Sequence, residues 1–441
     1  MTKLEKNAIK IVKRLNKASH TAYFAGGCVR DMVLGKEPKD FDIATDAKPE
    51  EVQKLFPKTF AVGKQFGVIV VVADGHNFDV ATFRGEEEYK DARRPSKVFW
   101  VKPKEDAQRR DFTINGLFYD PIAKKFIDYV GGEADIKAKI LRFIGEPEKR
   151  IEEDNLRILR AVRFKNNLNL KYEPKTKEAL LKLADQIQNV SAERTKDELD
   201  KILANSNRAK SIKDLSDLGT LKYVLPELET MKGVEQPKEF HNEGDVWEHT
   251  LLCLKNLPKN ASSTLAWAVM LHDIAKPQTW EYNQEKGRIT FYRHTKEGAE
   301  LTKKICERFK FSRKEKEEVV WLVRNHLRFK DLPKMKPARQ IRFISHPYIK
   351  NLLEVSYADS SSSYPKDFEL YDYAKALYER ERKKPKPPKP LLDGFEVMKI
   401  LNLKPGPAVG KAIKKLEDAQ LIGKIKTKDE AEKFVKGLKV S

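Results

Sequence analysis

The stretch AGGCVRDMVLGKEPKDFDIAT (25–45) decides how the N-terminal part of the chain folds. Its glycine pair, Gly26 and Gly27, follows an apolar run typical of a strand and precedes a helical pattern. Because glycine has no Cβ atom, the backbone of such a turn can approach a phosphate closely. Arg30 follows in the first helical turn, where its guanidinium can pair with triphosphate oxygens. The stretch therefore predicts a strand–turn–helix unit that binds a nucleotide.

The same stretch ends in a pair of carboxylates, Asp40 and Asp42, on either side of Phe41. Alternate residues of a strand share a face, so we expect both carboxylates to point the same way and Phe41 to enter the core. Asp79, in the alternating run FDVATF, is the candidate third carboxylate from a neighbouring strand. Adjacent carboxylates repel each other unless cations lie between them, so the group predicts a Mg²⁺ site for phosphoryl transfer. Each motif alone is better explained as a tight turn or a solvated edge strand; their combination favours the site.

Composition limits what the 441-residue chain can be. Lys and Arg number 87 and Asp and Glu number 66, and the resulting net charge of +21 favours a polyanionic partner, although it also suits solubility alone. The hydrophobic share of 40% excludes a disordered polyelectrolyte. No apolar run approaches the ~20 residues of a membrane-spanning helix, and the N-terminus lacks the apolar segment of a secretory signal. Three widely spaced cysteines predict neither a disulfide framework nor a cysteine zinc site, so we expect a cytoplasmic protein.

Further segments follow the aspartate pair in a fixed order: DARRP (91–95), RRDFTING (109–116), a DP…DYVGG run (120–132) and EEDNLRILRAVRF (152–164). Together with the first motif they resemble the class II family of CCA-adding tRNA nucleotidyltransferases and bacterial poly(A) polymerases, over about residues 20–225. The resemblance implies a polymerase-β-like α/β head with a small mixed sheet, followed by an all-α neck and body. It also implies that the charged segment 84–100 contains a flexible loop linked to the addition of adenosine.

The resemblance assigns roles to individual residues. It implies that Asp40 and Asp42 hold the catalytic Mg²⁺ ions, whereas Asp79 is a candidate from the strand pattern alone. Glu153 is expected to support the neighbouring arginines or the helix start. The residues that it implies at the nucleotide are Gly27, Arg30, Arg110, Asp154, Arg157, Arg160 and Arg163. On an ideal helix Asp154, Arg157 and Arg160 would lie within an arc of about 120°, with Arg163 about half a turn from Asp154.

Asp154 and Arg157 stand three residues apart, so one continuous helix would place them on the same face. A carboxylate accepts hydrogen bonds and a guanidinium donates them. Cytosine and adenine present an amine donor beside a ring-nitrogen acceptor, whereas uracil and guanine present the opposite order, so this pair suits C and A. An exposed ion pair of little energy is the alternative interpretation. That the helix faces the nucleotide is implied by the resemblance alone.

Histidines in the C-terminal half form a second ordered set with aspartates. Imidazoles and carboxylates together suit borderline transition metals, although a lone histidine on an apolar helix is more often a core residue. The set resembles the HD metal-dependent phosphohydrolase superfamily over about residues 241–365. The resemblance implies His249, His272, Asp273 and Asp359 as ligands, with His294 and His326 in accessory positions. A bound Mn²⁺, Ni²⁺ or Co²⁺ ion would activate water against a phosphate ester, so we treat phosphodiesterase or phosphatase activity as a hypothesis.

These patterns predict five parts: a nucleotidyltransferase head (1–140), a helical neck that binds RNA and nucleobase (141–230), an all-α HD domain (231–380), a Pro/Lys linker (381–390) and a small helical module (391–441). The predicted function is template-independent addition of CCA to tRNA 3′ ends from CTP and ATP. One alternative is a poly(A) polymerase or an enzyme that adds only A. Another, from a different class, is an HD phosphohydrolase whose head merely binds nucleotide.

Overall fold

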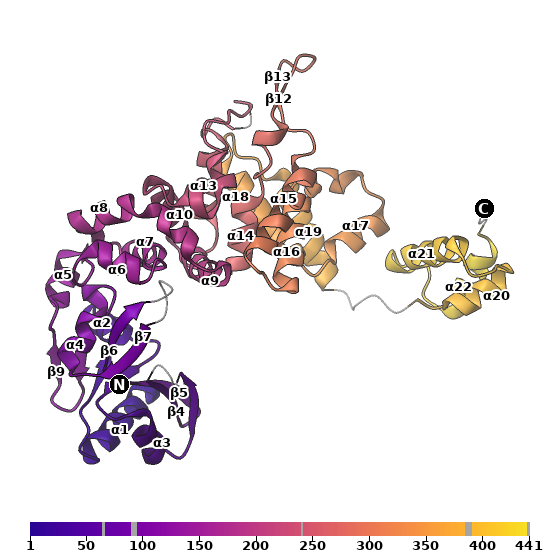
Figure 1. Ribbon diagram of the computed structural model, residues 1–441. Helices are drawn as coiled ribbons and strands as arrows, with labels where there is room; N and C mark the ends of the chain where they lie inside the picture. Colours follow the sequence, from indigo (N-terminus) through magenta and orange to yellow (C-terminus); the bar gives the residue numbers. More distant parts are fainter. Residues whose placement is uncertain (64–66, 90–94, 240, 384–389, 439–441) are drawn as a thin grey trace. The chain divides into compact units, whose positions relative to one another are not determined.

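The computed structural model describes residues 1–63, 67–89, 95–239, 241–383 and 390–438 (Figure 1). The chain forms two compact units, Met1–Glu229 and Thr230–Ser441. The finer five-part division expected from the sequence stays a prediction. Most of the expected linker at 381–390, and residues 91–94 of the DARRP motif, lie outside the described residues. No helix in the described part of the chain is both long enough and apolar enough to cross a membrane.

A mixed sheet forms the centre of the N-terminal unit. Its strands follow the order β3-β4-β5-β2-β1-β8-β9. Their bounds are β1 Ala22–Ala25, β2 Asp42–Thr45, β3 Thr59–Gly63, β4 Val68–Ala73, β5 His76–Thr82, β8 Phe118–Asp120 and β9 Lys125–Ile127. Only β2 and β5 run parallel to each other, with Ile43 opposite Val80, and every other neighbouring pair in this sheet is antiparallel. The β-branched runs therefore form the small mixed sheet that their pattern predicts.

Short helices and one hairpin complete the head. The helices are α1 Lys3–Lys17, α2 Gly27–Val33, α3 Pro49–Leu55, α4 Pro103–Gln108, α5 Gly132–Ala138 and the 3₁₀ turn η2 Thr113–Asn115. The turn between β1 and α2 depends on Gly26, whose φ of +73° is strained for other residues. Strands β6 Arg84–Tyr89 and β7 Pro95–Trp100 pair as an antiparallel hairpin, so the described parts of the expected loop are strands.

Helices build the rest of the N-terminal unit. They are α6 Pro147–Glu153, α7 Arg157–Asn167, α8 Pro174–Lys182, η3 Ala184–Asn189, α9 Ala192–Leu203, α10 Arg208–Asp217, α11 Leu221–Val224 and α12 Pro226–Glu229. A two-residue parallel ladder of β10 Ile140–Leu141 and β11 Lys171–Tyr172 is the exception to the all-α expectation. The single helix expected through EEDNLRILR is wrong, because α6 ends at Glu153 and Asp154 adopts an extended conformation with φ −150° and ψ 101°.

The C-terminal unit is helical apart from a hairpin of β12 Glu281–Asn283 and β13 Arg288–Thr290. Its helices are α13 Val246–Asn256, α14 Ser263–Leu271, η4 Pro277–Thr279, α15 His294–Arg308, α16 Arg313–Asn325, η5 Arg328–Lys334, α17 Pro337–Ile344, α18 Ile349–Ser362, α19 Glu369–Arg382, α20 Gly394–Leu401, α21 Pro407–Leu421 and α22 Lys428–Lys436. The sequence of α14 is apolar on every side, and it packs against α13, α16 and α18 (Figure 1). Because α14 is central, the residues that follow its C-terminus start inside the unit.

Close packing at Gly132 provides a test of the head's fold. A Cβ atom added there would lie 2.2 Å from the backbone oxygen of Thr113, so Gly132→Ala forces α5 away from η2. We expect a loss of ~3 kcal/mol or more in the free energy of unfolding. The control is Gly131→Ala, whose added Cβ atom would meet no atom within 4 Å. Its only cost is the backbone strain of a non-glycine residue at a φ of +79°, which lowers the free energy of unfolding by about 1 kcal/mol. Equal melting temperatures for the two variants would contradict this account.

Candidate active site and metal centre

Three aspartates gather where β2 and β5 lie side by side. Asp42 begins β2 and, by the parallel register, lies next to Asp79 of β5. Asp40 precedes the strand, which corrects the expectation that both residues of the pair lie on it, while Phe41 between them is 4% exposed, as predicted. Partial desolvation by the surrounding atoms, followed by the charges of Asp40 and Asp79, raises the pKa of Asp42 to about 6 although the residue is exposed. An all-oxygen group of mutually repelling carboxylates fits Mg²⁺.

An arginine of the RRDFTING segment, Arg110, lies beside both the glycine turn and this carboxylate group. Arg110 donates from Nε and Nη2 to Asp106, at 3.2 and 3.0 Å, and its charge lowers the pKa of Asp42 against the larger effects that raise it. A Cβ atom on Gly26 would lie 3.0 Å from Nη1 of Arg110. Glycine is thus needed here for two reasons, the positive φ and the close approach of a guanidinium. The second reason is not visible in the sequence pattern.

A hydrogen-bond chain connects α2 to α7 through the RRDFTING segment. Nη1 of Arg30 donates to Oδ1 of Asn115 at 2.8 Å, and Nδ2 of Asn115 donates to Oδ1 of Asp111 at 3.1 Å. The other oxygen of Asp111 accepts from Nε of Arg160 at 2.9 Å. Burial opposes ionisation of Asp111, but the Arg160 guanidinium outweighs it and lowers the pKa to about 2. Two of the predicted nucleotide-site arginines, Arg30 and Arg160, are therefore held by a carboxylate that sequence reasoning did not single out.

Three of the predicted arginines also surround one aromatic ring. The guanidinium carbons of Arg30, Arg160 and Arg163 lie 5.5, 5.3 and 4.2 Å from the ring centroid of Phe164. Distances within about 6 Å allow cation–π attraction. Arg163, which an ideal helix would separate from the set, reaches the same ring and pairs with the buried Glu198. Three guanidiniums thus meet at Phe164, and each of them is also paired with a carboxylate.

Asp154 and Arg157 do not share a helix face, because Asp154 lies in the break before α7. Both oxygens of Asp154 accept from Nη2 of Arg194 in α9, at 3.0 and 2.8 Å. Arg157 is 7% exposed and donates to the Arg150 carbonyl at 2.6 Å and to Glu153 at 2.7 Å. Each member of the pair is thus fixed by a different neighbour. The acceptor and the donor are held in place by ion pairs, not by helical spacing.

The second ordered set comes together in the C-terminal unit from several elements. His249 is in α13, His272 and Asp273 follow α14, His294 begins α15, His326 follows α16 and Asp359 is in α18. Three of the imidazoles share one arrangement: Nδ1 of His272, His294 and His326 each faces the carbonyl three residues earlier, at 2.7, 2.7 and 2.8 Å. A carbonyl requires the proton on Nδ1, which leaves a lone pair on Nε2 for a metal.

Asp273 separates the ligand atoms into two groups. Its Oδ2 lies 3.1 Å from Nε2 of His272, and its Oδ1 lies 3.6 and 3.7 Å from Nε2 of His294 and His326. On the first side, Nε2 of His249 is 3.1 Å from Oδ1 of Asp359. The predicted ligands and the predicted accessory histidines therefore occupy opposite sides of one carboxylate.

The electrostatics of this centre fit a cation. Burial, and then the nearby His272 and His294 rings, lowers the pKa of His326 to about 3, and the pKa of His294 is lowered mainly by burial. Both rings are therefore neutral, and their Nε2 atoms lie 3.3 Å apart. Nε2 of His272 is buried without a hydrogen-bond partner within the described ranges. The neutral His294 and His326 rings, with converging lone pairs, suit a divalent transition metal. Burial opposes the charged form of His272, but the Asp273 carboxylate raises the pKa of this ring to about 9, so a metal there would take the place of a proton.

Sequence reasoning missed residues that hold this centre. Oε1 of Glu243 lies 2.7 Å from Nδ1 of His249 and 2.8 Å from Nδ1 of His241, and Nζ of Lys276 lies 2.7 Å from Oδ2 of Asp273. Cys253 lies one helical turn after His249 in α13, and that spacing is a signal the sequence does contain. Glu243 precedes α13 in a loop, where no periodicity could identify it.

Comparison with known proteins places this geometry in a family. Family models match the poly(A) polymerase head domain over residues 22–142, the probable RNA and SrmB-binding site of polymerase A over 169–232, and the HD domain over 246–373. The CCA-adding enzyme of Bacillus licheniformis is 41% identical over 226 residues, which are 51% of this chain and 56% of that protein. The chain thus carries a poly(A) polymerase head domain, a polymerase A RNA-binding segment and an HD domain, and it is similar to CCA-adding enzymes. The predicted family is thereby confirmed.

Other family members define how far the similarity extends. The CCA-adding enzyme of Bacillus velezensis is 38% identical over 268 residues, 58% of this chain and 66% of that protein. The chain spans a little over half the length of the curated relatives first matched. The solved structure of the Bacillus stearothermophilus CCA-adding enzyme in complex with CTP matches with a TM-score of 0.73 at 25% identity, covering 98% of this chain and 96% of that one. The expected fold class, a mixed-sheet head with a helical body and an HD domain, is confirmed.

The head and HD domains imply dependence on divalent metal ions.

The Asp111–Arg160 ion pair predicts a pH-dependent stability. The pKa of Asp111 is depressed from 3.8 to about 2, so its contribution is present above the ordinary pKa and is lost as the pH falls from about 4 to about 2. Asp111→Asn should therefore lower the free energy of unfolding by about 2 kcal/mol at neutral pH. The difference from the unsubstituted protein should shrink through that acid range in denaturant titrations.

The matched control is Asp217→Asn, which removes an ion pair with Lys213 whose side chains are 58% and 55% exposed. An exposed pair of this kind contributes ~0–1 kcal/mol, so its loss should change stability little at any pH. If the loss of unfolding free energy in Asp111→Asn stayed the same from neutral pH down to about pH 2, the Asp111–Arg160 pair would not be its cause.

Proposed function

We propose that the protein is a template-independent tRNA nucleotidyltransferase that adds CCA to tRNA 3′ ends from CTP and ATP. One observation carries the proposal: the aspartate group of β2 and β5 lies beside the Gly26 turn and Arg110 in a chain related to proteins named CCA-adding enzymes. The net charge of +21 suits a polyanionic tRNA partner. Addition of A alone, and an HD phosphohydrolase with a merely nucleotide-binding head, are less well supported by these relatives.

In this proposal Asp40 and Asp42, with Asp79 beside them, hold Mg²⁺. When bound, Mg²⁺ supplies positive charge for the oxygens of an in-line displacement at the nucleotide α-phosphate. The chain's own contribution is to place the reactants. The backbone at Gly27 and the guanidiniums of Arg30 and Arg110 orient the triphosphate, with Arg160 and Arg163 adding positive charge.

We propose that Asp154 accepts from the exocyclic amine of C or A and that Arg157 donates to the ring nitrogen. Their separate anchoring supports this, since Arg194 fixes Asp154 and Glu153 fixes Arg157. Uracil and guanine would leave a carbonyl against the carboxylate and an N–H against the guanidinium. Buried polar groups left unpaired can discriminate by ~10⁴-fold.

The histidine–aspartate centre favours a second activity, hydrolysis of phosphate esters such as 2′,3′-cyclic phosphates. The observation behind it is the set of Nε2 atoms that converge on Asp273. Mn²⁺, Ni²⁺ or Co²⁺ held there by His249, His272, Asp273 and Asp359, with His294 and His326 as the accessory set, would supply an activated water. The protein residues supply the ligand orientation, through the three carbonyls that fix Nδ1.

The first test supplies each nucleotide separately to tRNA transcripts that end at the discriminator base, at C, or at CC. We expect CTP alone to extend the first two to CC and ATP alone to extend the third by one A, because the Asp154–Arg157 pair accepts both bases. The products are read as single-nucleotide steps on denaturing gels. Addition of A to the third transcript without any use of CTP would contradict CCA addition and favour the A-adding alternative.

The two sites should be separable by substitution. Asp40→Ala with Asp42→Ala removes the metal-binding carboxylates, so nucleotide addition should fall below detection while hydrolysis of a cyclic phosphate is unchanged. His272→Ala with Asp273→Ala should do the reverse. Both rates are measured on each variant after its circular dichroism matches the unsubstituted protein. Loss of both activities in either variant would contradict independent sites.

A further inference from the structure

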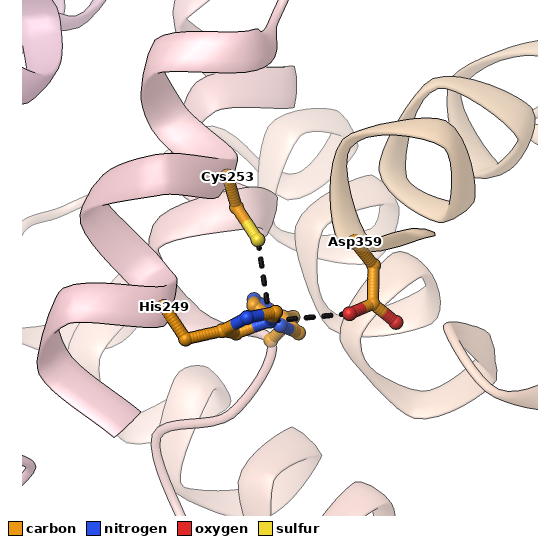
Figure 2. Close-up of side chains that lie close together, drawn as sticks. His249, Cys253 and Asp359 are labelled. Atoms are coloured by element: carbon orange, nitrogen blue, oxygen red, sulfur yellow. Dashed lines mark hydrogen bonds and ion pairs between the residues drawn. The ribbon is translucent and has the colours of Figure 1, made fainter. Parts of the chain in front are cut away.

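A cysteine lies inside the histidine–aspartate centre. Cys253 is fully buried in α13, and its Sγ lies 3.3 Å from Nε2 of His249. Figure 2 shows the Cys253 thiol and the Asp359 carboxylate pointing toward the His249 imidazole from two different helices. Ligand atoms of His249, Cys253, His272 and Asp359 all lie within 4.8 Å of one another. Donor atoms bound about 2.0–2.3 Å from a single ion lie within such a distance of each other.

A neutral His249 ring cannot satisfy both of the carboxylates that face it. Glu243 accepts at Nδ1 of His249, which places the proton there and leaves the Nε2 lone pair facing both Asp359 and Cys253. A lone pair 3.1 Å from a carboxylate oxygen needs either a second proton or a metal cation between them. The geometry around His249 therefore requires a positive charge.

A second observation points to the same place. The side chain of His272 is 1% exposed, and its Nε2 has no hydrogen-bond partner in the parts of the chain that the structure describes, although Oδ2 of Asp273 lies 3.1 Å away. Its Nδ1 is already used by the Val269 carbonyl at 2.7 Å. This buried nitrogen lies within 4.8 Å of the Cys253 sulfur, and its electron pair is available to bind a metal.

We propose that Cys253, as a thiolate, is a direct ligand of the metal bound by His249, His272, Asp273 and Asp359. This inference rests on the metal centre of the second proposed activity and extends its ligand set. Binding transfers the thiol proton to solvent as the sulfur–metal bond forms, so no oxidant or reductant is involved. Two imidazoles, the two carboxylates of Asp273 and Asp359 and one thiolate form a mixed N₂O₂S set, which favours Co²⁺ or Zn²⁺ over the oxygen-preferring Mg²⁺ and Mn²⁺.

The test uses the full chain, stripped of metal with a chelator and titrated with Co²⁺. We expect a near-ultraviolet sulfur-to-cobalt charge-transfer band in the unsubstituted protein. Cys253→Ser should lose the band and bind Co²⁺ about 10-fold or more weakly, with a smaller loss for Mn²⁺. The control is Cys306→Ser, which changes another fully buried cysteine of the same unit, in α15, and should keep the band.

A second measurement needs no variant. Bound Co²⁺ should protect Cys253 from alkylation, read by peptide mass spectrometry in mild denaturant, more strongly than it protects Cys306, a fully buried cysteine of the same unit. Co²⁺ bound without the charge-transfer band, or without protection of Cys253, would overturn the thiolate ligand and leave the metal centre standing. Failure to bind Co²⁺ at all would overturn both.

Discussion

The buried carboxylate of Asp111 is the constraint on which the nucleotide side of the molecule depends. A charge that is cut off from water must be paired, and Asp111 is paired with Arg160 directly and with Arg30 through Asn115. The three partners belong to α7, α2 and η2, so a single ionised group sets the distance between the head and the first long helix of the neck. The same pairing holds the Arg30 and Arg160 guanidiniums against the ring of Phe164.

The HD domain also buries a carboxylate, Asp273, and there histidines lie around it. Its central helix α14 is apolar on every side and ends directly at His272 and Asp273, so polar groups begin where the helix stops. Neighbouring helices bring the remaining side chains to that point. Three backbone carbonyls fix the imidazole tautomers, and Glu243 fixes a fourth ring. Ligand direction is thus determined by the backbone of the same helices that form the core.

Much of this was predictable from local pattern. The alternation around Phe41 and the β-branched run of β4 correctly indicate a buried sheet, because periodicity directly reports which face is buried. The break in the helix at Asp154 was not predictable, because no proline or glycine marks it. The Arg194 contact that holds Asp154 comes from α9, which is distant in the sequence. The spacing between the three cysteines likewise gave no indication of Cys253 as a metal ligand. The residue that Cys253 contacts is a histidine, His249, one helical turn earlier. Long-range ion pairs leave no local signal in the sequence.

The parallel pairing of β2 with β5 has a consequence for the order of folding. The antiparallel pairs β4–β5 and β8–β9 join neighbouring segments and close short loops, whereas β2 reaches β5 only across α3, β3 and β4. Loop-closure entropy delays such non-local contacts until much of the domain has collapsed. A nascent chain therefore acquires its hairpins first and juxtaposes Asp42 with Asp79 late. Three mutually repelling acids are brought together only when the surrounding sheet is rigid enough to keep them there.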